Sequence, residues 1–298
     1  MNRILKLLTR RLKNYKWILF CLCFLNNSFG QKKIGIQISP KLGFSRSQTS
    51  WAISGNLDGM SPNVMSELLW SNSSISSGFE SEFSWKRFVF KTDVSRSYSA
   101  DGLVSDSDYT LDNRQGLSYN ESFNSKGSEF SSFKIESEYE LFDNRFYLTV
   151  GYHYMRSENK LIHQDLKYSM YKWNLEGPTL GAKYMFNFSD NLSNYSGVDV
   201  LFSKYYAIAN WILREDLQHP ISFTHNLNRG YGLNFSNYLK INIYNKFFIG
   251  WKSNFIIYSR ADGLDTAYLK SGSSFTTKLY YLRLNSIDNH ISFLFNLQ

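Results

Sequence analysis

The chain has 298 residues with a formal net charge of +8, from 33 Lys and Arg against 25 Asp and Glu. The excess is concentrated in residues 1–30, which hold six basic residues and no acidic one, so 27 basic residues face 25 acidic ones in the rest. A nucleic-acid-binding role is excluded as an interpretation, because the remaining sequence has no basic surplus to bind phosphates.

Residues 1–30 have the three-part layout of a secretory signal peptide. A basic stretch, 1–16, is followed by an apolar run, 17–25, and then by 28–30, with small residues where a signal peptidase cleaves. The apolar run is shorter than the roughly 20 residues of a membrane-spanning helix. We therefore predict cleavage between Gly30 and Gln31 rather than a retained anchor. Both cysteines lie in this segment, so no disulfide is expected in the mature chain.

The mature chain, residues 31–298, is expected to form one all-β domain. It contains no apolar stretch of about 18 residues, so a helical membrane protein is excluded. Aromatic residues make up 17% of the sequence, prolines number only four, and the mean hydropathy is −0.36. A secreted soluble β-sandwich and an outer-membrane β-barrel remain as alternatives.

Apolar and polar residues alternate along the whole mature chain, which indicates strands with one apolar and one polar face. The clearest runs are 34–44, 133–141, 146–154 and 231–243. Several runs reach about 15–20 residues, well beyond a typical globular strand. This length favours a barrel whose aromatic-rich face contacts lipid and whose polar face lines the interior. His153 is then expected to be a hydrogen-bonding group in that interior.

The connections between runs alternate between tight and long. The tight ones are 85–87, 143–145, 189–191 and 244–246, and the long ones are roughly 46–63, 99–115, 156–170, 209–228 and 259–275. This alternation is typical of outer-membrane barrels with short periplasmic turns and long extracellular loops. It predicts a ten-stranded antiparallel transmembrane β-barrel with both termini on the periplasmic side.

The final segment, 273–298, leaves two possibilities open: one strand, or two strands separated by a turn at 285–289. Its aromatic alternation over 291–297 is typical of the last strand that the barrel-assembly machinery recognises, which is therefore an expected partner. Tryptophans near strand ends are expected to anchor at the boundary between lipid and water; they are Trp85, Trp173, Trp211 and Trp251.

Ten strands enclose a narrow interior, so general diffusion is not expected and the candidate chemistry lies in the outer loops. The second loop contains Asp106 and Asp108, and two neighbouring carboxylates can share a proton. The fourth loop contains Asp216 and His219, and an acid beside an imidazole can orient it as a general base. The competing interpretation is that these residues only solvate the loops.

Three short stretches resemble the omptin family of outer-membrane barrels, and more closely the related Protochlamydia-type outer membrane proteins. They are 51–56 continuing to 62–70, then 102–109, and 285–290. The omptin family includes ten-stranded surface proteases, some of which bind lipopolysaccharide. The resemblance implies that Asp106 and Asp108 match the catalytic aspartate pair.

The second catalytic element implied by the resemblance departs from the family pattern. Omptins carry an Asp and a His separated by one residue, whereas Asp216 and His219 are separated by two. Side chains at that spacing point to opposite faces of an extended backbone. His225, at the start of the next strand, has no Asp shortly before it.

We favour a non-enzymatic omptin-like barrel with a structural, binding or narrow-pore role. The alternative is a surface endopeptidase that uses Asp106, Asp108, Asp216 and His219 on peptides with basic sites. No cofactor is expected, and no residue cluster has the spacing of metal ligands. The expected partners are outer-membrane lipid and lipopolysaccharide, and the oligomeric state is left open.

Overall fold

The computed structural model describes residues 34–142, 145–162, 167–244 and 246–297. The predicted signal peptide and its cleavage site lie outside these residues. The described residues form twelve strands. Among these residues, no helix is long and apolar enough to cross a membrane. The strands are β1 (Gly35–Ile53), β2 (Ser66–Trp85), β3 (Phe88–Leu111), β4 (Gln115–Asn124), β5 (Glu129–Phe142), β6 (Phe146–Ile162), β7 (Tyr168–Ser189), β8 (Leu192–Asn210), β9 (Phe223–Tyr244), β10 (Phe247–Arg260), β11 (Gly263–Tyr268) and β12 (Ser274–Leu297).

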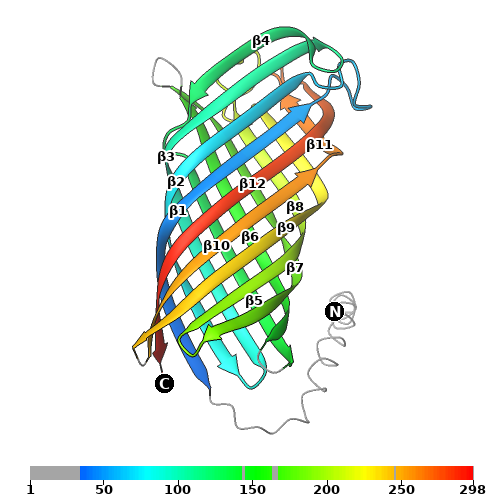
Figure 1. Cartoon of the computed structure of the whole chain (residues 1–298). Coiled ribbons are helices and arrows are strands. Elements are labelled where there is room, and N and C mark those ends of the chain that lie inside the picture. Colours follow the sequence, from blue (N-terminus) through cyan, green and yellow to red (C-terminus); the bar gives the residue numbers. More distant parts are fainter. Residues whose placement is uncertain (1–33, 143–144, 163–166, 245, 298) are drawn as a thin grey trace, which may run out of the picture. The chain divides into compact units, whose positions relative to one another are not determined.

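Ten of these strands form a closed antiparallel ring, which confirms the predicted barrel. Its order is β1-β2-β3-β5-β6-β7-β8-β9-β10-β12, and β12 pairs back with β1 (Figure 1). Closure leaves no free sheet edge within the ring, as the interior of a bilayer requires. β12 is one unbroken strand, paired with β1 and β10 through 285–289, so the final segment is not split and the strand number is even.

Tight and long connections occupy opposite ends of the barrel, which we call the turn end and the loop end. The four predicted tight turns join β2 to β3, β5 to β6, β7 to β8, and β9 to β10. Lys86 in the first of them has a positive φ of 55°. The predicted alternation of short turns and long connections is therefore confirmed, except that most of the predicted loop 156–170 is strand, because β6 continues to Ile162 and β7 begins at Tyr168.

The structure differs from the sequence prediction in the extent of the second loop. Residues 99–115 were expected to be a loop, but β3 continues to Leu111 and returns as β4, forming a hairpin that rises above the ring (Figure 1). Backbone pairing between β3 and β4 holds this hairpin. The hairpin needs no apolar outer face, because it extends beyond the part of the barrel that contacts lipid.

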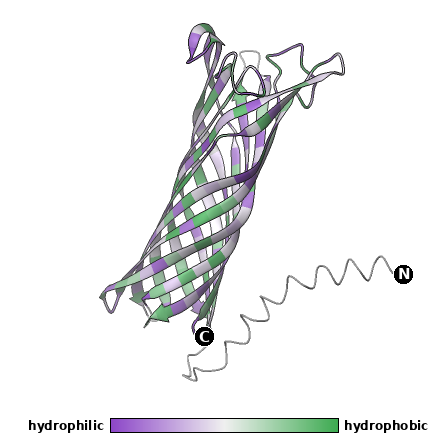
Figure 2. Ribbon diagram, turned by 90° about the vertical axis from the view of Figure 1, so that its right-hand side faces the viewer, coloured by the Kyte–Doolittle hydropathy of each residue, from purple (hydrophilic) through white to green (hydrophobic). Residues whose placement is uncertain are grey.

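Burial along the strands is reversed relative to a water-soluble protein. On β1, Leu42 and Phe44 face outward and are 61% and 54% exposed, whereas Lys41 and Ser45 face inward and are 4% and 5% exposed. Exposed apolar residues recur on strands around the barrel, and Figure 2 shows hydrophobic and hydrophilic residues alternating along the ribbon. An apolar outer surface and a polar interior suit a barrel surrounded by lipid, and contradict the soluble sandwich.

The interior near the turn end is filled by ion pairs between strands. Lys252 of β10 pairs with Asp93 of β3 at 2.8 Å and with Glu80 of β2. Lys134 of β5 pairs with Asp199 of β8 at 2.7 Å. Similar contacts join Lys41 to Asp93, Lys91 to Glu138, and Lys183 to both Glu136 and Glu138. Except for Lys91–Glu138, which joins the neighbouring strands β3 and β5, these pairs tie together strands that are not neighbours in the ring.

The interior near the loop end is apolar and aromatic instead. Its buried side chains include Trp51, Trp70, Tyr171, Trp173, Tyr205, Trp211 and Phe223. The expectation that Trp173 and Trp211 anchor in lipid is therefore wrong, because both point into the barrel. Trp85 and Trp251 are exposed on the outside, and their anchoring at the boundary between lipid and water stays a prediction.

Candidate functional site

A cleft of about 520 Å³ opens at the loop end, and we call it the outer cleft. The β3–β4 hairpin forms one wall, and β11 with the connection between β8 and β9 forms another. Its apolar lining includes Trp51, Leu68, Trp211, Leu217, Phe223 and Phe275, and its charged lining consists of Asp106, Asp108, Glu121, Arg214 and Asp265. The outer cleft therefore combines an apolar surface with an excess of carboxylates.

The structure brings Asp106 and Asp108 together in the outer cleft. They are two residues apart on β3, so both side chains point to the same face of the sheet. Asp106 is only 5% exposed, and its register partner on β4 is Glu121. Burial, followed by repulsion from Asp108 and Glu121, raises the pKa of Asp106 to about 7. This carboxyl group therefore exchanges its proton near neutral pH.

The predicted pairing of Asp216 with His219 does not form in the structure. Arg214 donates from Nε and Nη2 to the two Asp216 carboxylate oxygens, both at 2.8 Å. This bidentate contact lowers the pKa of Asp216. His219 Nδ1 lies 2.8 Å from Asn210 Oδ1 instead. The wall of the outer cleft includes Arg214 but neither Asp216 nor His219.

A different acid–histidine pair lies beneath the outer cleft. His225 of β9 and Asp265 of β11 are register partners, with Nε2 and Oδ1 3.1 Å apart. His225 Nδ1 is 2.8 Å from the Tyr171 hydroxyl, which is 2.6 Å from the hydroxyl of Tyr205. His225 is fully buried, and the ring of Trp51 packs against it at 4.7 Å.

Sequence reasoning missed this pair for a clear reason. Asp265 follows His225 by forty positions and lies in a segment that was predicted to be a loop. Pairing of β11 with β9 is what brings the two side chains together. No local spacing signal in the sequence could have revealed it.

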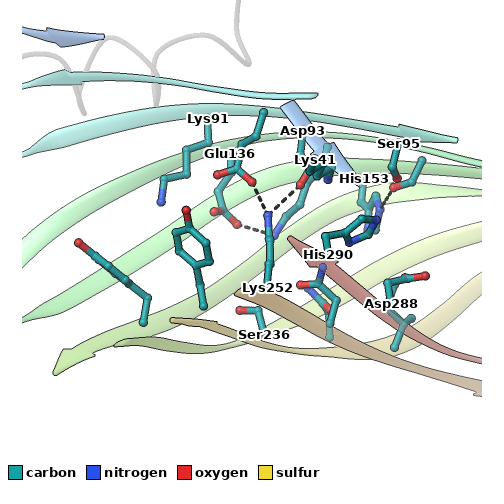
Figure 3. A pocket seen from close by; sticks show the side chains of 18 of the residues that line it. Lys41, Lys91, Asp93, Ser95, Glu136, His153, Ser236, Lys252, Asp288 and His290 are labelled. Carbon is teal, nitrogen blue, oxygen red and sulfur yellow. Dashed lines mark hydrogen bonds and ion pairs between the residues drawn. The ribbon is translucent and has the colours of Figure 1, made fainter. Parts of the chain in front are cut away.

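A second, smaller cavity of about 90 Å³ lies among the ion pairs of the interior (Figure 3). Its lining includes Lys41, Asp93, His153, Lys252, Asp288 and His290. His153 Nε2 lies 2.8 Å from Ser132 Oγ, so its predicted role as an interior hydrogen-bonding group is confirmed. The volume suffices for a few water molecules. Within the part of the chain that the structure describes, no group of three or more acidic, His or Cys side chains could hold a metal ion.

Comparison with solved structures places the fold among outer-membrane barrels. The outer membrane protease OmpT from Escherichia coli is similar with a TM-score of 0.73 and 9% sequence identity, over 91% of this chain and 99% of that one. OprG from Pseudomonas aeruginosa has a TM-score of 0.37 and 10% identity, over 88% and 96% of the two chains. The translocator domain of the autotransporter NalP from Neisseria meningitidis has a TM-score of 0.36 and 11% identity, over 96% of each.

The likeness to OmpT shows a shared fold only, because so few residues are identical, and the two lower scores carry no further argument. No curated protein sequence matches the chain. Residues 39–293 match the family described as Protochlamydia outer membrane protein, which covers most of the chain. The protein is therefore an outer-membrane β-barrel with the fold of an omptin, and it belongs to the Protochlamydia outer membrane protein family.

Proposed function

We propose that the protein is a surface receptor whose outer cleft binds cationic peptides that also carry apolar side chains. The observation that carries this proposal is the combination of Asp106, Asp108 and Glu121 with an aromatic surface in one cleft at the loop end. Long loops are extracellular in outer-membrane barrels, so this end faces potential ligands.

Charge supports a cationic ligand over an anionic one. Arg214 is the one basic residue in the described wall of the cleft, and its guanidinium already forms a bidentate contact with Asp216. The charges available to a ligand are therefore the carboxylates of Asp108 and Glu121, joined by that of Asp106 as the pH rises through its pKa of about 7. The apolar surface beside them would bury Leu or aromatic side chains at roughly 25 cal/mol per Å² removed from water.

The contents of the barrel support binding at its mouth rather than transport through it. Ion pairs fill the interior near the turn end, and packed aromatic side chains fill it near the loop end. Porins that pass solutes leave a wide aqueous channel with about sixteen strands.

The test measures peptide binding to protein refolded in detergent micelles, by fluorescence anisotropy. A peptide of alternating Arg and Leu should bind, and a matched peptide of Glu and Leu should not. Replacing both Asp106 and Asp108 with Asn should weaken binding about tenfold or more, since charge complementarity is lost. Asp190→Asn, which removes a carboxylate at the turn end, is the matched control and should have no effect. Equal binding of the two peptides would refute the proposal.

A second candidate function is surface endopeptidase activity, favoured by one observation. Asp106 has a pKa of about 7 beside Asp108, and carboxylate pairs that share a proton can activate water. Cleavage of a dibasic fluorogenic peptide should then be lost in Asp108→Ala, and the variants His219→Ala and His225→Ala would identify the base. Equal rates in the wild type and all three variants would eliminate this function.

Lipopolysaccharide is proposed as the lipid partner, at a hollow of about 520 Å³ on the outer surface of β6–β9. Lys204 and Arg229 supply positive charge there against one carboxylate, Glu176, and aromatic surface comes from Tyr152, Phe202 and Tyr231. A phosphorylated headgroup that carries acyl chains matches both features, because basic side chains bind phosphate and aromatic rings favour the membrane interface.

A further inference from the structure

Among the described residues, strand pairing closes the loop end of the barrel on one side and leaves it open on another. Where β10 ends, β11 takes its place and pairs with both β9 and β12. On the other side, β4 lies next to β3 at the loop end, beyond the start of β5. It pairs with β3 along most of its length, but it pairs with β6 only at Asn124, opposite Ile162. Among the described residues, the outer edge of β4 therefore has no partner strand over 115–122.

The free edge can be assigned to particular backbone groups. The Ser125 N–H donates to the Gly102 carbonyl at 2.8 Å, so this position faces β3. Successive residues of an antiparallel strand face opposite neighbours. The N–H and C=O groups of Asn120 and Ser122 therefore face the free edge, on the same side as those of Asn124.

Natural proteins usually protect an exposed edge with proline, lysine or a covering element. Residues 115–124 contain neither proline nor lysine, and this strand is largely exposed. The one feature that protects this edge is the charge of Glu121, which faces the cleft. This charge disfavours pairing with a neutral or acidic strand and favours pairing with a basic one.

The side chains beside this edge form rows that continue into the outer cleft. Glu121 lies directly opposite Asp106, and Tyr119 lies opposite Asp108. Like charges directly opposite each other on neighbouring strands are unfavourable. Among the described residues no Lys or Arg forms an ion pair with Asp106, so a cation in the next position of that row would relieve the repulsion.

We propose that the free edge of β4 takes up an extended cationic segment of another protein as an additional β-strand. The added strand forms backbone hydrogen bonds with Asn120 and Ser122, which is the mode of recognition by strand addition. Its inward Lys or Arg side chain lies beside Glu121 and Asp106. This inference rests on the proposed binding of cationic peptides and specifies how the outer cleft holds them.

The test uses the variant Ser122→Pro with Ser122→Ala as its control. Proline removes the backbone donor at the free edge and blocks it with the ring, while the contacts with β3 remain. Alanine keeps the donor. Binding of the Arg–Leu peptide should fall about tenfold or more in Ser122→Pro and change by less than about twofold in Ser122→Ala. Heat-modifiable gel migration confirms that both variants form the barrel.

A peptide series provides an independent measurement on the wild-type protein. Two Arg–Leu peptides are compared, one N-methylated at the odd-numbered residues and the other at the even-numbered residues. One of them should lose binding and the other should keep it, because only alternate amides of the bound peptide face β4. Equal loss with both peptides, or equal affinity of Ser122→Pro and Ser122→Ala, would overturn strand addition while leaving cleft binding intact. Dimerisation of peptide-free protein that Ser122→Pro abolishes would also overturn it, because the edge would then be occupied by a second copy. Absence of any peptide binding by the wild type would instead refute the proposed function.

Discussion

Replacement of Lys252 with Met should strongly destabilise the barrel. Lys252 pairs with Asp93 at 2.8 Å and with Glu80, and it is the cation paired with Glu80 among the described residues. Asp93 keeps a second partner, Lys41. The substitution therefore leaves the Glu80 carboxylate inside the barrel without its cation. Breaking a buried pair in this way costs about 3–5 kcal/mol of the free energy of unfolding.

Urea unfolding of the refolded protein, followed by tryptophan fluorescence, measures this cost. Lys278→Met is the matched control, because Lys278 pairs with Asp262 in the connection between β10 and β11 at the loop end, with side chains 29% and 61% accessible. Its loss should cost no more than about 1 kcal/mol. Adding Glu80→Leu to Lys252→Met should recover most of the stability, since the unpaired charge is removed. A cost for Lys252→Met as small as that for Lys278→Met would refute the reasoning, because the interior would then solvate charges as bulk water does.

Three further predictions follow from the same geometry. Peptide affinity should rise between about pH 6 and pH 8, because a cationic ligand favours ionised Asp106, whose pKa is about 7; titration of Asp106→Asn should show a flatter profile. Ionisation of this buried group opposes folding, since its pKa is raised above 3.8 in the folded state, so wild-type stability relative to Asp106→Asn should fall as pH rises from about 4 to 7. Replacing Lys204 and Arg229 with Ala should reduce lipopolysaccharide binding, measured by co-sedimentation, while Arg145→Ala at the turn end should not.

The period of the sequence predicted the barrel because lipid and the polar interior impose opposite demands on successive residues. One strand, β1, shows both demands: its outward residues Leu42 and Phe44 are apolar, and its inward residues Lys41 and Ser45 are polar. The same logic gave the ten-strand ring and the placement of His153. The extension of β3 to Leu111 was missed because a polar hairpin beyond the membrane needs no apolar face.

The candidate site was only partly predictable. Asp106 and Asp108 were found because they are close in sequence, although they were placed in a loop; in the structure they share a face of β3. The predicted pairing of Asp216 with His219 was wrong, because Arg214, two residues from Asp216, binds its carboxylate instead. Alternation also cannot distinguish Trp173 facing lipid from Trp173 facing a dry aromatic interior, because either environment accepts an indole.

The central claim is that ligands bind at the outer cleft against β3 and β4. The most direct measurement is photo-crosslinking of an Arg–Leu peptide that carries a photoreactive residue, followed by mass spectrometry of the linked fragments. We expect cross-links to fall on 104–123 and on the facing residues of β11, and to disappear with excess unlabelled peptide. Competable cross-links confined to the turn end or to the lipid-facing surface would contradict the account.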